Sequence, residues 1–407
     1  MKTGQPINWP VYYFVFMVKE DLFPIVIDLL EAVEKNKHHF STIGVSNGIS
    51  GIALLYICLY HSTGEVSYAD KAREIIFDSI EKLNNDYGSR IIFREIAEMG
   101  IMLELSRNVA LIGEELDDLL TDFDDVLFNE MKEQIHQGNY DPVTGALAQG
   151  NYFLSRKNSA IATEALALLD EFLMHSAIWE GNMAYWKSKL KEKETVYLGL
   201  SHGSAAIINY LITRSKNGFF SKDKEQLISA ATNYILSKEI KNNPVFFPVQ
   251  VGERYKDDQV YSNNLCYGDP GTLYGLLTAL QFLNRADEME MLRKMTCLVA
   301  KRDLSFPYLS SGYSLLYGKA GLYSLYAHLS EKLDSPELGR AAARIFADLV
   351  AAYDEKDDFR GYRGHWNQQI ETTNFSFIEG IAGIAVTLLS GISPIIGQYH
   401  RAYFNLN

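Results

Sequence analysis

Six side chains that could take part in proton transfer or metal binding stand beside short glycine-containing segments. They comprise two carboxylates, one imidazole, one thiol and two phenols: Asp141, Glu379, His202, Cys266, Tyr267 and Tyr317. Imidazoles and carboxylates are common general acids and bases, and a thiolate is both a nucleophile and a metal ligand. If the glycine segments meet in space, the sequence predicts one cavity that combines these groups. The catalytic candidates are then His202, Asp141 and Tyr267.

Each of these residues also has a structural interpretation. His202 could link neighbouring loops by hydrogen bonds, and Asp141 precedes Pro142, a pair that often starts a helix with Asp as the N-cap. Cys266 could be a small buried apolar residue. The two tyrosines could fill a barrel with their rings, and the glutamate could bond a loop backbone. The residue types alone leave both interpretations open.

These residues recur because the chain repeats a glycine-rich loop followed by an apolar segment. Seven imperfect copies are spaced 48 to 65 residues apart. They read NGISGIAL at Gly48, AEMGIMLEL at Ala97, TGALAQGNYFL at Gly145, HGSAAIINYL at Gly203, YGDPGTLYGLL at Gly268, YGKAGLYSLY at Gly318 and EGIAGIAVTLL at Gly380.

The repeat predicts a loop that turns sharply and starts a helix, since glycine permits positive φ and close approach of the backbone. Amphipathic helical patterns lie between the copies, for example at 71–85, 115–135 and 340–353. Because helix pairs of this kind must stack to bury their apolar faces, we expect an all-α fold, an α/α toroid of seven helix pairs with apolar inner and amphipathic outer helices. We expect one domain over 1–407, with a helical segment at 1–40 closing the ring and short β pieces within 242–251.

Composition narrows the classes of partner. A formal net charge of -13 disfavours binding to nucleic acid or to an anionic membrane surface. No apolar run is long enough to span a bilayer, and the apolar stretch 11–18 is followed by charges without a cleavage site, so we interpret it as the start of a packed helix. Three cysteines in 407 residues are typical of a reducing compartment, so we expect a cytoplasmic protein.

The motifs resemble the lanthionine synthetase C-like (LanC) cyclases over almost the whole chain, most specifically in GLSHG at 199–203 and CYGDPG at 266–271. The resemblance implies a seven-repeat α/α toroid that closes thioether rings in ribosomally made peptides. In that family a peptide cysteine adds to a dehydroalanine or dehydrobutyrine made by a dehydratase. A zinc ion activates the thiol, held by a cysteine of a Trp-Cys-Tyr-Gly motif and by a later Cys-His pair.

Carried over residue by residue, the resemblance gives an incomplete zinc site. Cys266 matches the first zinc cysteine, although Leu265 replaces the usual tryptophan. The later Cys-His pair falls on Leu316 and Tyr317, and an arginine of the family falls on Ser262. Because a catalytic zinc normally has three protein ligands, we predict no bound zinc and no other cofactor. Cys266, Tyr317 and Glu379 are then substrate-binding residues or vestiges of the metal site.

The acid–base residues implied by the resemblance are retained. Asp141 matches the aspartate assigned to proton transfer, His202 the active-site histidine, and Tyr267 the tyrosine beside the zinc cysteine. Two functions remain open: a cyclase that works without zinc, or a degenerate scaffold that binds a dehydrated precursor peptide, in either case with a dehydratase and a transporter as possible partners.

A third function comes from another class of α/α toroid. Carbohydrate-processing enzymes use paired carboxylates, for which Asp141 and Glu379 are candidates, with tyrosines and Trp186 or Trp366 as sugar platforms. The Cys-Tyr-Gly and Ser-His-Gly segments have no role in that alternative.

Overall fold

The structure is a computed structural model that describes residues 19–85, 87–107, 115–189, 195–241, 245–252, 263–302, 312–362, 374–404 and 406. The predicted segment 11–18, Ser262 and Trp366 lie outside these residues. None of the helices in the described part combines the length and the apolar character that a bilayer crossing requires.

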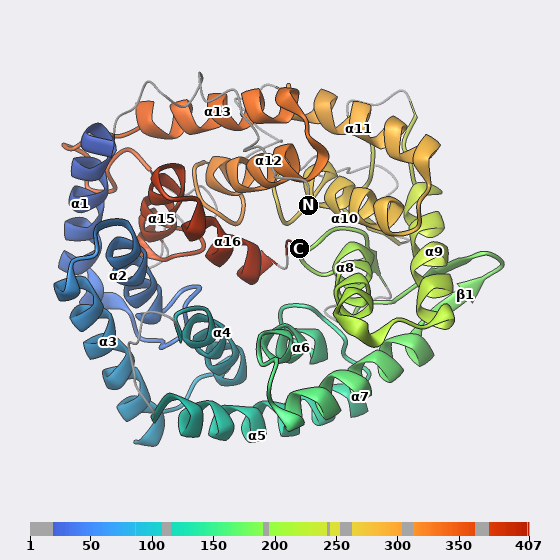
Figure 1. Cartoon of the computed structure of the whole chain (residues 1–407), viewed down its shortest axis with the longest axis horizontal. Helices are drawn as coiled ribbons and strands as arrows, with labels where there is room; N and C mark the ends of the chain where they lie inside the picture. Colours follow the sequence, from blue (N-terminus) through green and yellow to red (C-terminus); the bar gives the residue numbers. More distant parts are fainter. Residues whose placement is uncertain are drawn as a thin grey trace, which may run out of the picture.

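Two concentric rings of helices make up the described part of the chain (Figure 1). The inner ring contains α2 (Ser50–Thr63), α4 (Ile92–Leu105), α6 (Ala146–Ser155), α8 (Ser204–Arg214), α10 (Asp269–Phe282), α12 (Lys319–Leu333) and α15 (Ile381–Ile392). The outer ring contains α1 (Lys19–Lys35), α3 (Val66–Asn84), α5 (Glu115–His136), α7 (Ala160–Ser176), α9 (Lys222–Leu236), α11 (Ala286–Ala300) and α13 (Pro336–Ala351). The prediction of an α/α toroid is confirmed.

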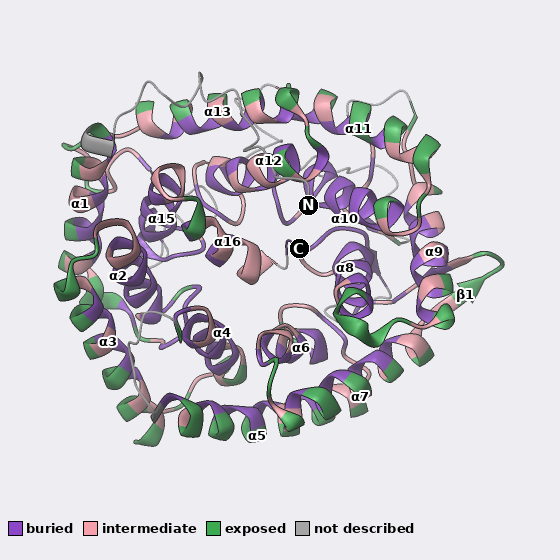
Figure 2. Cartoon of the chain, viewed as in Figure 1, coloured by how far each residue is buried: buried purple, intermediate pink, exposed green. Residues whose placement is uncertain are grey.

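Burial follows the two kinds of helix. Every residue of α2 from Ser50 to Leu59 is buried, whereas α13 buries one stripe and exposes the other face (Figure 2). The stripe on α13 is Leu338, Ala342, Ile345 and Leu349, at the three- and four-residue spacing of an amphipathic helix. The ring closes where α1 packs against α15 and α2.

Short strands and short helices lie between or beside the helices of the two rings. Two antiparallel pairs are present, β1 (Ile178–Glu180) with β2 (Met183–Tyr185) and β3 (Val196–Tyr197) with β4 (Gln250–Val251). The second pair contains the end of the predicted β segment at 242–251, of which residues 242–244 lie outside the described part. The remaining elements are η2 (Lys37–His39), η4 (Ser215–Phe219), η5 (Pro394–Ile396) and α16 (Gly397–Phe404).

Six of the seven glycine segments lead into an inner helix as predicted, and we call the residues up to each first glycine an entrance loop. The second copy differs, because Ala97 lies inside α4, which already begins at Ile92. The expectation of positive φ holds only at Gly268, with φ 94°, among the first glycines of the copies. At Gly203 φ is -122°, but a Cβ would lie 2.5 Å from the Tyr197 carbonyl, so close approach is what requires glycine there.

The last helix leaves the ring wall. α16 packs against α4 and α12 and lies in the middle of the ring (Figure 1). Buried aromatic rings and polar contacts fix α16 in place, so this helix is an integral part of the protein interior. Side-chain hydrogen bonds join Tyr399 to His61 at 3.1 Å, His400 to Ser324 at 2.9 Å, and the Tyr403 hydroxyl to the Glu98 carbonyl at 3.0 Å.

Candidate functional site

The entrance loops meet at one end of the ring and line a cavity of about 240 Å³. Backbone hydrogen bonds join three of them in series, from the Leu316 amide to the Ile378 carbonyl and from the Ile378 amide to the Ser46 carbonyl. Most loops contribute the residues directly before their glycine. These lining residues are Ser46 and Asn47, Ser201 and His202, Cys266, Leu316 and Tyr317, and Ile378 and Glu379.

His202 is held by a carboxylate behind it. Its Nδ1 lies 2.8 Å from Asp141 Oδ2, and Asp141 is buried. Because a carboxylate accepts the hydrogen bond, Nδ1 carries the proton and Nε2 is the nitrogen left for a ligand in the cavity. The other oxygen, Asp141 Oδ1, accepts hydrogen bonds from the amides of Val143 and Thr144, both at 2.8 Å. Asp141 therefore organises its own loop and orients the imidazole.

This arrangement decides between the interpretations of Asp141. The N-cap residue of α6 is Gly145, so Asp141 caps the turn that precedes this helix and not the helix itself. Val143 and Pro142 line the cavity, whereas Asp141 and Tyr267 stand behind the lining residues. His202 both links two entrance loops and faces the cavity, so its structural and chemical interpretations are compatible.

Aromatic rings support the imidazole. The Tyr197 and Tyr267 ring centroids lie 5.6 and 6.0 Å from the His202 ring, and Tyr267 stacks on Tyr317 at 6.2 Å with an interplanar angle of 10°. Burial raises the pKa of Tyr267 to about 12, and burial also raises the pKa of Tyr317. Both phenols therefore stay protonated near neutral pH and act as rings and hydrogen-bond donors.

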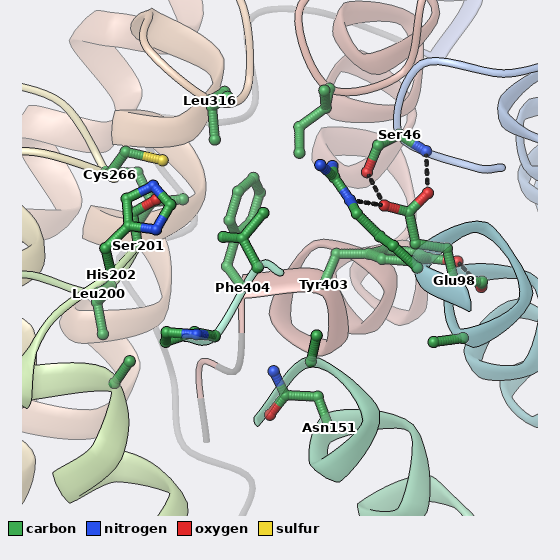
Figure 3. Close-up of a pocket in the computed structure, with 18 of the residues that line it drawn as sticks. Ser46, Glu98, Asn151, Leu200, Ser201, His202, Cys266, Leu316, Tyr403 and Phe404 are labelled. Atoms are coloured by element: carbon green, nitrogen blue, oxygen red, sulfur yellow. Dashed lines mark hydrogen bonds and ion pairs between the residues drawn. The ribbon is translucent and has the colours of Figure 1, made fainter. Parts of the chain in front are cut away.

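The thiol of Cys266 is buried and protonated. Its residue is 3% exposed, and burial raises the pKa of the Cys266 thiol to about 12, against the opposing effects of a Ser201 hydrogen bond and the positive charge of Arg94. A thiol with such a pKa is a poor nucleophile at neutral pH. Cys266 lies beside His202 in the cavity wall (Figure 3), and we assign it a role in the lining and not as a nucleophile.

The opposite wall carries an ion pair from α4. Arg94 Nε donates to Glu98 Oε1 at 2.7 Å, and Glu98 accepts two further hydrogen bonds from Ser46, from its hydroxyl at 2.6 Å and from its amide at 2.8 Å. Figure 3 shows Ser46 and Glu98 across the cavity from Cys266 and His202, with Phe404 of α16 between the two sides.

The donor set around Cys266 does not fit a zinc ion. Leu316 and Tyr317, at the positions of the two other ligands, offer a hydrocarbon and a buried phenol whose pKa is raised by burial. One nitrogen of His202 already bonds Asp141. Within the described ranges, no three His, Cys, Asp or Glu side chains lie close enough together to hold a metal. The absence of bound zinc from the protein stays a prediction, because only metal analysis tests it.

Comparisons with known proteins bear on the family and the fold of the chain. The family model described as "Lanthionine synthetase C-like protein" matches residues 36–401. The chain belongs to the lanthionine synthetase C-like family. This LanC-like chain is also similar in fold to the solved structure titled "Nisin cyclase", with a TM-score of 0.76, 17% sequence identity, and coverage of 95% of this chain and 98% of that chain. No curated protein matches the sequence.

The sugar-platform prediction for Trp186 is wrong. Trp186 is 1% exposed, and its indole Nε1 donates to the Leu173 carbonyl at 3.0 Å, so its ring cannot stack on a ligand. The other proposed platform, Trp366, lies outside the described residues. Of the two carboxylates suggested for sugar chemistry, Glu379 lines the cavity and Asp141 is committed to His202.

Sequence reasoning missed the wall made by Arg94, Glu98 and α16. A signal for the first two exists, since Arg94 and Glu98 are charged residues four positions apart in a helix whose other residues are largely apolar. The second repeat copy also has Ala97 in place of the first glycine, and at this position the chain is already helical instead of forming an entrance loop. The position of α16 had no comparable signal, because its sequence GQYHRAYF belongs to no repeat.

Proposed function

We propose that this LanC-like protein binds a dehydrated precursor peptide at the loop end of the ring and closes a thioether without zinc. The observation that carries the proposal is the His202–Asp141 pair, held at 2.8 Å with the imidazole lining the cavity. A cavity of about 240 Å³ fits one or two peptide side chains, since sites for drug-sized ligands take roughly 300–1,000 Å³. We also propose a cytoplasmic location.

The reaction needs one proton to move twice. His202 Nε2 takes the proton from the peptide thiol, and the sulfur adds to the β-carbon of the dehydroamino acid. The electrons of the carbon–carbon double bond move to the neighbouring carbonyl and form an enolate. The imidazolium then returns the proton to the α-carbon, so that the product contains every atom of the two reactants. Asp141 stabilises the imidazolium formed between these two steps.

A base without a metal is sufficient on energetic grounds. Transfer from an ordinary thiol to an ordinary imidazole is unfavourable by roughly two pKa units, or about 3 kcal/mol. Holding the thiol against the acceptor carbon in the right orientation is worth roughly 7–11 kcal/mol in favourable cases. Positioning by the loops can therefore offset the missing activation of the thiol.

The incomplete donor set around Cys266 favours a second candidate, a peptide-binding scaffold without cyclase activity. In this form the toroid would present the precursor peptide to a dehydratase or to a transporter. It would use the same cavity, because the lining does not depend on a metal, and it would leave every peptide thiol free.

The two candidates differ in the fate of the thiol. The wild-type protein is incubated with a synthetic peptide that contains one dehydroalanine and one cysteine, and free thiols are counted with time. The proposed function predicts thiol loss and a product of unchanged mass, with a loss of rate on the order of 100- to 10,000-fold in His202→Ala. His175→Ala is the matched control, since the His175 side chain is 77% exposed and lies near the end of an outer helix. Peptide binding with no thiol loss would instead establish the scaffold.

A further inference from the structure

The guanidinium of Arg94 stands in the cavity wall with part of its hydrogen-bonding capacity unused. Arg94 lines the same cavity as His202 and Cys266, and its side chain is 26% exposed. Nε donates to Glu98. In the described part of the chain no residue hydrogen-bonds the outer nitrogens Nη1 and Nη2, so four N–H groups remain for a ligand.

The position of this guanidinium is fixed from behind. Glu98 holds Arg94 Nε at 2.7 Å and is itself held by the hydroxyl and the amide of Ser46. Glu98 also packs against Gly44, where a Cβ would lie 2.9 Å from Glu98 Oε2. The Tyr403 hydroxyl bonds the Glu98 carbonyl. A donor supported in this way needs little reorganisation when charge develops in front of it.

The charge of Arg94 reaches the reaction side of the cavity. It lowers the pKa of the Cys266 thiol and of the Tyr317 hydroxyl, in opposition to the larger effect of burial on each. Arg94 therefore lies within electrostatic range of Cys266 and Tyr317, which line the cavity together with His202. Its element, α4, is the one inner helix of the described part that has no entrance loop, because the helix begins several residues earlier.

The surrounding charges indicate which ligand suits Arg94. Glu98 pairs with the guanidinium, and Glu379 lines the same cavity and acts on Arg94 electrostatically. A permanently anionic ligand would be repelled by these carboxylates. A neutral carbonyl oxygen avoids that cost and gains most from the N–H groups when negative charge develops on it.

We propose that Arg94 is a catalytic residue that binds the carbonyl oxygen of the dehydroamino acid through its Nη atoms and stabilises the enolate. This inference rests on the proposed function. The substrate class that it names is a peptide in which the dehydro residue carries its own amide carbonyl. When sulfur adds to the β-carbon, the π electrons move onto this oxygen, and they return to the α-carbon as His202 delivers the proton there.

The test is steady-state kinetics of thioether formation by Arg94→Gln with the synthetic dehydroalanine peptide. We expect kcat to fall on the order of 100-fold, as for loss of one oxyanion donor, while the Kd of the peptide, measured by fluorescence anisotropy, stays near the wild-type value. Arg94→Lys keeps the charge without the planar guanidinium, so we expect its kcat to lie between those of the wild type and Arg94→Gln. Added guanidinium ion is expected to restore part of the activity of Arg94→Ala, which a purely structural loss would not allow.

Arg107→Gln is the matched control. Arg107 also donates through Nε to a glutamate of α4, Glu104, at 2.9 Å, but it lies outside the cavity lining. Its kcat and Kd should both match the wild type. Thermal unfolding of each variant separates lost catalysis from lost folding, and Arg94→Lys keeps the test decisive if Arg94→Gln proves unstable.

Failure of this inference is distinguishable from failure of the proposed function. If wild-type protein consumes thiol and Arg94→Gln does so at the same kcat, only the role of Arg94 is overturned. If kcat is unchanged but Kd rises, Arg94 binds an anionic peptide group, which also overturns it. If wild-type protein consumes no thiol above the His202→Ala background, the cyclase function and this inference fall together.

Discussion

In the entrance loop before α10 the amide of Tyr267 donates to Asn264 Oδ1 at 2.8 Å, and in the loop before α12 the amide of Tyr317 donates to Ser314 Oγ at 3.3 Å. Both loops pack so tightly against a second glycine that a side chain at that position has no space. A Cβ at Gly271 would lie 2.2 Å from the Leu265 carbonyl oxygen, and one at Gly321 would lie 2.0 Å from that of Leu315.

The two loops therefore share the close contact at the second glycine, although φ is 94° at Gly268 and -124° at Gly318, and they differ in the side chains that face the cavity. Cys266 occupies in one loop the position that Leu316 occupies in the other, and both face the cavity. Because main-chain contacts and small caps maintain the loop, the presented side chain can change without loss of the fold. We therefore predict that substitutions at two positions, Leu316 and Tyr317, are enough to return metal binding to this ring.

Returning the metal ligands is the strongest test of this equivalence. In Leu316→Cys with Tyr317→His, three donors would line one cavity, and we expect close to one zinc ion per chain by elemental analysis where we expect almost none in the wild type. Zinc at 100 times its Kd would stabilise the variant by about 2.7 kcal/mol.

Adding Cys266→Ser to that variant should remove most of the zinc. Two results would contradict the comparison. One is stoichiometric zinc in the wild type that is lost in Cys266→Ala, and the other is a rebuilt variant that binds none although it folds normally.

Alkylation measures the environment of the retained thiol. With its pKa raised to about 12, Cys266 has a thiolate fraction that increases tenfold per pH unit up to that value. At pH 8 this fraction is on the order of 1,000-fold below that of an ordinary cysteine, whose pKa is about 8.5. In a timed iodoacetamide experiment read by mass spectrometry, we expect partly exposed Cys297 to be modified first. Modification of Cys266 at the rate of Cys297 at pH 8 would show that the thiol is activated.

Replacing the second glycine tests the close contact that the two loops share. Gly271→Ala and Gly321→Ala each place a methyl group against a carbonyl oxygen, and we expect each to lower the free energy of unfolding by about 1–3 kcal/mol. The measurement is urea denaturation. Gly88→Ala is the control, since a Cβ there meets nothing within 4 Å. A large effect in one loop and none in the other would break the equivalence.

The smallest expected difference lies in the side chains that cap the loops. Asn264→Ala removes the shorter hydrogen bond to an amide and should cost about 1 kcal/mol, whereas Ser314→Ala removes a longer one and should cost about 0.5 kcal/mol. Both values are accessible from denaturation midpoints. Equal costs would indicate that the 2.8 and 3.3 Å bonds contribute alike.

The sequence was sufficient to predict the ring because glycine spacing and apolar periodicity are local properties that recur in each unit. The loop position of His202, Cys266 and Tyr317 followed from the same repeat. Which of the predicted residues reach the cavity did not follow, since Asp141 and Tyr267 stand directly beside lining residues in the chain yet lie behind them.

The contribution of α4 and α16 to the cavity wall could not be predicted from the repeat pattern. At Ala97 the pattern predicted another loop, whereas Arg94 and Glu98 stabilise a helix through their ion pair at four-residue spacing. Phe404 and Tyr403 reach the cavity only because α16 turns inward, and that path depends on tertiary contacts with α2, α4 and α12.

The packing of α1 against α15 has a consequence for how the molecule comes apart. A linear stack of helix pairs has terminal units with one neighbour each, and it can fray from them. Here α1, the first described helix, packs against α15, the last helix of the inner ring, and this contact closes the ring. Every unit then has a neighbour on both sides, so opening the circle at any point severs an interface that no preceding step has weakened. The loops that face one another across the cavity keep their spacing only while that circle is shut.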